Sequence, residues 1–440
     1  MKTKALLFAL LALQMLDGAW AQGEDETRTA RYQSTYNWQM HPTFRSAYQS
    51  ANSLSSGRDS MFTFSLTAHW GARVWPGGEV YFNPEIASGV PFTQSLVGLG
   101  GFTNGEITRA AGTSPQLYRQ RLFLRQTWNQ GGGSETLASG FNQMAQTVDL
   151  NRTVLTIGNF STLDVFDGNA YAKDPRSQFM NWGNWTYAAW DYAADARGFG
   201  WGLALEVYRD DWVFRWGRMT GPKEPNGLAV DFRLLQHYGD QVEVERSHEI
   251  GGRPGKLRLL AFHNRAVLAA FNDASAYLID NNHADRQTIL MVRNGPKTNQ
   301  GLGLNIEQEL ADDVGFFFRG MHAAGATETY AFTEVDRSVS TGFQLKGNRW
   351  GRPADRVGVA VLQNRLSPER RRYLELGGLS FFIGDGRLDY KPETIIEGYY
   401  NWAMMPGLWL SGGYQKIRNP AYNSSRGPVN VFAARLHAEF

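Results

Sequence analysis

The sequence has 440 residues and contains no cysteine, which excludes disulfide bonds and thiolate metal sites. It also lacks any run of the roughly 18 apolar residues that a membrane-spanning helix needs. The formal net charge is only +2, so no bulk charge favours nucleic acid. We therefore expect no metal, no other cofactor, no nucleic-acid partner and no helical membrane anchor.

Aromatic residues and glycine are abundant instead. Phe, Tyr and Trp make up 13% of the chain, and there are 48 glycines. Without helical spans, this composition suits a β-rich chain with many turns and aromatic side chains at a membrane interface. A soluble, sugar-binding β-sandwich has a similar composition, so composition alone leaves both open.

The amino terminus has the pattern of a processing signal. Lys2 and Lys4 precede a short apolar run at 5–16, and Ala19-Trp20-Ala21 forms an A-x-A cleavage site. We predict a signal peptide at 1–21, the alternative being an amino-terminal core helix. Residues 22–57 match no clear pattern, and we expect at most a short helix between Tyr32 and Tyr48.

Period-2 alternation, the mark of a β-strand, runs through the rest of the chain. The last stretch shows it best, because apolar side chains share one face and the other face carries charge. The apolar face consists of Phe432, Ala434, Leu436, Ala438 and Phe440. The same pattern recurs upstream from Met61 onward, so the chain predicts many strands of one kind.

Connections between these strands alternate in length. Turns at 209–211, 311–313 and 404–407 are short, whereas those near 218–238, 266–298 and 324–334 are long. Outer-membrane barrels have short turns on one rim and long loops on the other. We therefore predict that residues 58–440 form one all-β domain, a transmembrane antiparallel β-barrel of about 16 strands with an aqueous lumen.

One predicted strand carries three arginines. In the segment 118–128, Arg119, Arg121 and Arg125 fall on one face, opposite Leu122, Leu124 and Trp128. Three guanidinium groups on one face are costly unless that face is wet or paired. The face is either a solvated surface of a soluble sheet or the lining of a pore, where the donor forks can bind hydroxyl groups.

A segment rich in acidic residues, 164–176, follows the next strand. Its spacing is not that of an EF-hand and no bidentate Glu closes it, so we favour a loop folded inward with its acids opposite the arginines over a calcium site. The aromatic cluster after it, at 182–192, predicts either an interfacial girdle or a stacking surface. Ser367, Pro368 and Gly377 delimit a short helix, whose arginines we expect to be solvated.

Several blocks of the sequence resemble the carbohydrate-selective porin (OprB) family. They include the segments 118–128, 158–175, 350–353, 367–378, 384–390, 414–423, 426–428 and 435–440, so that the resemblance covers roughly residues 60–440. It departs from the family at Ser425, where an acidic residue is expected. The resemblance implies a 16-stranded barrel in the outer membrane of a Gram-negative bacterium. It also implies passive uptake of small, glucose-like sugars through a constriction of Arg and acidic side chains. Carried onto this sequence, the constriction residues are Arg119, Arg121 and Arg125, with Asp164 and Asp167 as their acidic partners.

Other functions remain open beside the sugar porin. The same barrel could serve as a general or anion-preferring porin, or as a channel for an acidic polysaccharide. We do not expect an enzyme, because the histidines are scattered and no Ser lies in a hydrolase-type elbow. The expected partners are small sugars, outer-membrane lipid and lipopolysaccharide, and the barrel is expected to be either a monomer or a homotrimer.

Overall fold

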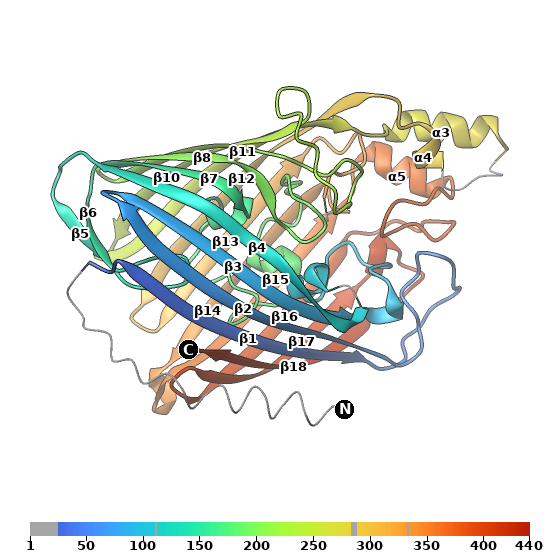
Figure 1. Cartoon of the computed structure of the whole chain (residues 1–440). Helices are drawn as coiled ribbons and strands as arrows, with labels where there is room; N and C mark the ends of the chain where they lie inside the picture. The colour runs from blue at the N-terminus through green and yellow to red at the C-terminus, as the bar shows by residue number, and fades with distance from the viewer. Residues whose placement is uncertain (1–24, 111, 283–287, 332–333) are drawn as a thin grey trace.

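Sixteen antiparallel strands close into one barrel in the computed structural model, which describes residues 25–110, 112–282, 288–331 and 334–440 (Figure 1). The predicted strand number is confirmed. The barrel strands are β1 Arg28–His41, β2 Asp59–Trp75, β3 Gly78–Val90, β4 Gly112–Asn129, β7 Arg152–Phe160, β8 Gly200–Arg209, β9 Trp212–Met219, β10 Tyr238–Ile250, β11 Arg253–Val267, β12 Pro296–Ala311, β13 Val314–Ala323, β14 Arg337–Gly347, β15 Arg352–Arg365, β16 Glu393–Met405, β17 Leu408–Arg418 and β18 Val429–Glu439.

The barrel closes between the first and the last strand. β1 pairs with β18 from Gln33 opposite Glu439 to Met40 opposite Phe432. The short helix expected between Tyr32 and Tyr48 is therefore wrong, because most of that stretch belongs to β1. The barrel extends back to Arg28, into the segment of 22–57 that the sequence left unassigned. The predicted signal peptide at 1–21 lies outside the described residues.

Alternate residues of the strands point to the outer face and to the inside of the barrel, as the sequence predicts. In β18, Phe432 and Leu436 are 46% and 39% exposed on the outer face, whereas Arg435 and His437 are buried inside. A lipid-facing surface can leave apolar side chains uncovered, whereas inward charges need partners. Five of the eight exposed tryptophans among the described residues lie at or beside the rim of short turns, namely Trp75, Trp128, Trp212, Trp350 and Trp402.

The two rims differ as expected. The short-turn rim joins strands through tight turns such as 210–211, 312–313 and 406–407. The long-loop rim carries the helices α3 Phe271–Asp280, α4 Thr288–Met291 and α5 Pro368–Glu375, which lie together at one end of the barrel (Figure 1). It also carries the short 3-10 segments η2 Phe92–Gln94, η3 Gly105–Arg109 and η6 Pro420–Tyr422, whereas η5 Asn348–Trp350 lies in a short turn. Among the described residues, no helix is long and apolar enough to cross a membrane.

Helix α5 forms where the sequence predicts it. The Ser367 side chain caps it by accepting from the Arg370 backbone N–H at 3.1 Å, with Pro368 in the first turn. The expectation that its arginines are solvated is wrong for Arg370. This side chain is fully buried and pairs with Glu334 and, at 3.1 Å, with Asp336. α5 is therefore fastened to the loop that precedes β14.

One connection on the short-turn rim breaks the pattern. Residues 130–151 join β4 to β7 and contain a separate two-stranded hairpin, β5 Ser134–Leu137 and β6 Gln146–Asp149. This hairpin lies at the end of the barrel opposite the helices (Figure 1). Its tip, residues 138–145, is important for the lumen described next.

Candidate pore constriction

The connection from β7 to β8, residues 161–199, crosses the inside of the barrel. It contains η4 Thr162–Asp164 and α2 Trp182–Trp185. Its middle part is held by strands β16 and β18 on the opposite wall. The Met180 backbone N–H donates to Glu397 of β16 at 2.7 Å, and Arg435 of β18 donates to the Pro175 carbonyl at 2.7 Å. We call residues 161–199 the crossing loop.

The aromatic residues of the crossing loop form its core. Trp182, Trp185, Tyr187, Trp190 and Tyr192 are each at most 5% exposed. The rings of Trp182 and Tyr192 stack with centroids 6.0 Å apart, and Trp190 packs edge-on to Tyr192. The girdle reading of this cluster is wrong, and rings so deeply buried are covered by protein rather than offered to a solute. They fix the loop across the lumen.

Arg121 and Asp164 meet where the crossing loop begins. Arg121, on β4, donates from Nε and Nη2 to the two carboxylate oxygens of Asp164 at 2.7 and 2.6 Å. Asp164 is oriented by η4, since its carboxylate also accepts the Ser161 N–H at 2.9 Å in a capping box. Both side chains keep partial access, at 12% and 25% of their surface. Their pairing is the arrangement that the sequence predicts for this loop.

Asp167 does not join that pair. It is fully buried and receives hydrogen bonds from Arg319 at 2.8 Å, Asn305 at 2.6 Å and Thr186 at 2.9 Å. Arg319 lies on β13, far from the arginine strand in the sequence. The expectation that Asp167 partners Arg119, Arg121 or Arg125 is therefore corrected. It holds the crossing loop to another part of the wall.

The three arginines of β4 do not all lie on one face of the strand. The pairing of β3 with β4 shifts register between Asn83 and Pro84, so that Arg121 and Arg119 have partners but Gln120 has none. Beyond this bulge the faces exchange. The Arg119 guanidinium lies over the Trp201 ring at 4.9 Å and donates to Asn159 at 3.3 Å. The predicted common face does not hold for Arg119, whereas Arg125 lies inside with Arg121.

The hairpin tip, residues 138–145, folds into the lumen from the short-turn rim. Its backbone is held by inward side chains, with Arg125 donating to the Asn142 carbonyl at 2.9 Å and the Tyr81 hydroxyl accepting the Met144 N–H at 3.2 Å. The Phe141 ring packs on His69 of β2 at 4.6 Å. Arg31 of β1 donates to Ser139 at 2.7 Å. The tip therefore contacts β1 to β4 in turn and narrows the same side of the lumen.

Comparison with known proteins places this barrel in a family. The profile of the carbohydrate-selective porin, OprB family, matches residues 51–440. The chain belongs to that family. A search of curated protein sequences gave no match.

Solved structures agree on the fold of this porin. The high-pH structure of Pseudomonas putida OprB superposes with a TM-score of 0.67 at 14% identity, covering 94% of each chain. Its low-pH structure gives 0.50 at 11% identity, covering 94% of this chain and 93% of that one. The outer-membrane channel DcaP of Acinetobacter baumannii gives 0.52 at 9% identity, covering 97% of this chain and all of the other. Family and fold together place the porin in an outer membrane.

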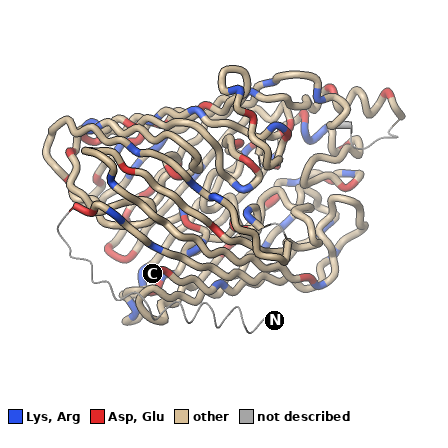
Figure 2. The backbone as a smooth tube through the Cα atoms, viewed as in Figure 1, with Lys and Arg blue, Asp and Glu red and all other residues tan. Residues whose placement is uncertain are grey.

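Charged residues are spread along the strands and loops of the porin (Figure 2). Those whose side chains pair inside the barrel fall into two sets that differ in exposure. Along β8 to β13 they form a buried ladder. Arg215 bonds Glu243 at 2.9 Å, and Arg258 bonds Glu245 at 2.6 Å. The arginines of this ladder are at most 9% exposed, whereas Arg73, Arg109, Arg121 and Arg125 near β2 to β4 are 12–21% exposed. These four arginines near β2 to β4 are therefore more accessible than the arginines of the ladder.

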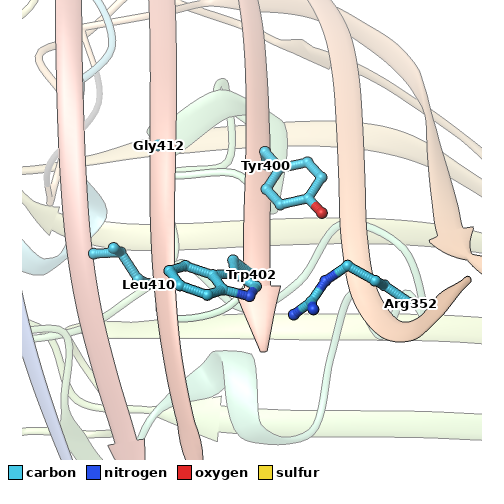
Figure 3. A pocket seen from close by; sticks show the side chains of 5 residues that line it. All are labelled: Arg352, Tyr400, Trp402, Leu410 and Gly412. Atoms are coloured by element: carbon cyan, nitrogen blue, oxygen red, sulfur yellow. The ribbon is translucent and has the colours of Figure 1, made fainter. Parts of the chain in front are cut away.

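The cavities on the outer face of the barrel are not part of the lumen. One of about 410 Å³ is bordered by Arg352, Tyr400, Trp402, Leu410 and Gly412 (Figure 3). Tyr400, Trp402 and Leu410 are exposed on the lipid-facing side, and Gly412 leaves a notch between them. The described residues also contain no group of three acidic or histidine side chains that could hold a metal ion.

Replacing Asp167 tests its anchoring role. Asp167→Ala would leave the Arg319 guanidinium buried without its carboxylate, which costs about 3–5 kcal/mol. We expect denaturant to release the crossing loop at a lower concentration, seen by fluorescence of its tryptophans. Asp312→Ala is the control, because the Asp312 side chain is 88% exposed in its pair with Arg253 and should contribute below about 1 kcal/mol. Equal effects of the two variants would contradict the anchoring role.

The acidic groups of the constriction predict a pH response. Enclosure in the lumen opposes ionisation of Asp164, but Arg121 outweighs it, so the pKa of this carboxyl lies below its usual value. In Glu106 of η3, burial is likewise outweighed, here by Arg176 and Arg109, and its pKa is also lowered. A lowered native pKa means that the stabilisation is complete above the unfolded pKa and is lost as pH falls through the native one.

Ion selectivity should follow the same titration. We expect the reversal potential in a salt gradient to stay constant from about pH 7 to about pH 5, and to move toward anions only below about pH 4. The arginines keep their charge throughout this range. A transition centred between about pH 5 and about pH 7 would show that another group controls selectivity.

Proposed function

We propose that this porin conducts small neutral sugars of glucose size by passive diffusion, and that Arg121, Arg125 and Asp164 form its selective ring. The bidentate Arg121–Asp164 pair, still partly exposed where the crossing loop meets β4, supports this proposal most directly. A paired guanidinium and carboxylate offer donors and acceptors to hydroxyl groups at little net charge. Residues 1–21 would direct the chain to export.

Passage needs weak binding. A sugar in the ring exchanges hydrogen bonds with water for bonds with these side chains, and it must leave again without energy input. We expect half-saturation in the millimolar range, which corresponds to about −4 kcal/mol. The hairpin tip would narrow the lumen on the short-turn side of the ring. It also fixes Arg125, which donates to the Asn142 carbonyl.

An anion-preferring porin is the second candidate, and one observation favours it. The arginines of the accessible side are 12–21% exposed, whereas the side chains of Glu79 and Glu106 beside them are only 1% and 2% exposed. Asp164, at 25% exposed, is the one accessible carboxylate named on this side, so accessible cations outnumber accessible carboxylates there. An anion would gain from this excess more than a neutral sugar would.

Titration of the ion current with glucose tests the proposal. Single channels in planar bilayers should lose current as glucose is added, with half-saturation in the millimolar range. Addition of a trisaccharide should cause less block, because it fits the ring less well. Absence of any glucose effect, together with a strong anion preference, would favour the second candidate.

A further inference from the structure

A groove runs across the outer face of the barrel from β10 to β15. Its volume is about 850 Å³. Gly320 of β13 leaves its floor open, since a Cβ there would meet nothing closer than the Phe318 ring at 3.4 Å. Exposed apolar side chains, including Leu259, Leu302 and Val339, form its walls. The groove is therefore an apolar depression on the lipid-facing side of the barrel.

Three basic side chains stand at the long-loop end of this groove. His322 of β13, Arg337 of β14 and Arg365 of β15 are neighbours in register, His322 opposite Arg337 and Arg337 opposite Arg365. All three are exposed. They come from strand ends, so they lie at the level where an apolar bilayer core gives way to head groups.

Neither of the two arginines forms an ion pair with a carboxylate of the described residues. Arg365 donates to the Gln363 amide oxygen at 2.9 and 2.6 Å, an interaction that does not neutralise its charge. Within the described part of the chain, no carboxylate lies within ion-pair distance of Arg337 or Arg365, and no residue lining the groove is acidic. The neighbouring Asp336 is buried and turned to Arg370 at 3.1 Å. Two adjacent guanidinium groups that form no ion pair favour an anion between them.

We propose that this groove binds one phosphorylated lipid of the outer leaflet, with an acyl chain over Gly320 and a phosphate between Arg337 and Arg365. The long-loop rim of an outer-membrane barrel faces the cell exterior, so the lipid comes from that leaflet. Basic pockets at the head-group level, above an apolar surface, recognise anionic lipids in this way. The site lies on the outer face and does not depend on what passes through the lumen.

Native mass spectrometry of the purified barrel, with lipid A as the probe, tests the site. We expect one tightly retained lipid A per barrel. Arg337→Glu combined with Arg365→Glu should weaken this binding at least about tenfold, because both phosphate ligands become repulsive. Arg418→Glu is the matched control, since Arg418 ends β17 at the same rim but does not line the groove. Unchanged retention in the double variant would overturn the proposal.

Two further experiments distinguish binding of the lipid head group from binding of the acyl chain. Gly320→Trp should fill the floor and lower lipid A retention, while leaving the basic residues in place. Dephosphorylated lipid A should bind at least about tenfold more weakly than lipid A. Equal binding of the two lipids, or displacement of lipid A by millimolar inorganic phosphate, would overturn the lipid site. Glucose block of the ion current should be the same in all these variants, so failure here is distinct from failure of the proposed function.

Discussion

Replacing the hairpin tip, residues 138–145, with an Asn-Gly turn is expected to raise the single-channel conductance of this porin about twofold, because pore width controls ion flow. The tip lies against inward side chains of β1 to β4, on the side of the lumen where arginines stay accessible. Its removal should also release Arg125 from the Asn142 carbonyl. Larger sugars should then pass faster, and discrimination between glucose and a trisaccharide should decline.

Single substitutions within the same connection provide the comparison. Phe141→Ala should give a smaller rise in conductance, since only the ring beside His69 is lost. Leu150→Ala should change nothing, because Leu150 is an exposed residue at the base of the hairpin. If the shortened variant inserts as an intact barrel and conducts like the parent, the tip does not limit the pore.

Arg121→Ala is expected to have the largest effect on sugar binding. Loss of a charged hydrogen-bonding group costs about 1.5–3 kcal/mol, so the half-saturation for glucose should rise about tenfold or more. The same change leaves the Asp164 carboxylate without its guanidinium. Ion selectivity should therefore move toward cations, measured as a shift of the reversal potential in a salt gradient.

Arg119→Ala is the matched control on the same strand. Arg119 has the same side chain two residues away, but it contacts Trp201 and Asn159 rather than Asp164. We expect glucose half-saturation and reversal potential to stay close to those of the parent. Asp164→Asn should shift selectivity the opposite way to Arg121→Ala. If Arg119→Ala weakened glucose binding as much as Arg121→Ala, the assignment of Arg121 to the ring would be wrong.

Much of the barrel was predictable because its physics is periodic. A strand with lipid on one side and water on the other must alternate apolar and polar residues, as Phe432 and Arg435 show in β18. The lengths of the connections then indicate which strand ends lie at the same rim. The first strand, β1, could not be predicted in this way. In β1, polar residues such as Ser34 also occupy the outer face, so the pattern there is weak. Its identity comes from pairing with β18, which no local pattern reveals.

The constriction was predictable only in part, for similar reasons. The pairing of Arg121 with Asp164 could be anticipated from an arginine strand followed by an acidic loop. The separation of Arg119 depends on one unpaired residue, Gln120, which reverses the faces and has no clear sequence signal. Asp167 is bound by Arg319, a contact between distant segments that spacing cannot predict. The hairpin tip was missed because its role depends on folding back into the lumen.

Swelling of liposomes that contain the purified porin tests the central claim most directly. Glucose, gluconate and a trisaccharide at equal osmolarity are compared by initial rate. The account predicts faster swelling with glucose than with either of the others, because the Arg121–Asp164 ring favours a small neutral hydroxylated solute. Gluconate entering as fast as glucose, or faster, would contradict a sugar-selective constriction and leave a general or anion-preferring porin.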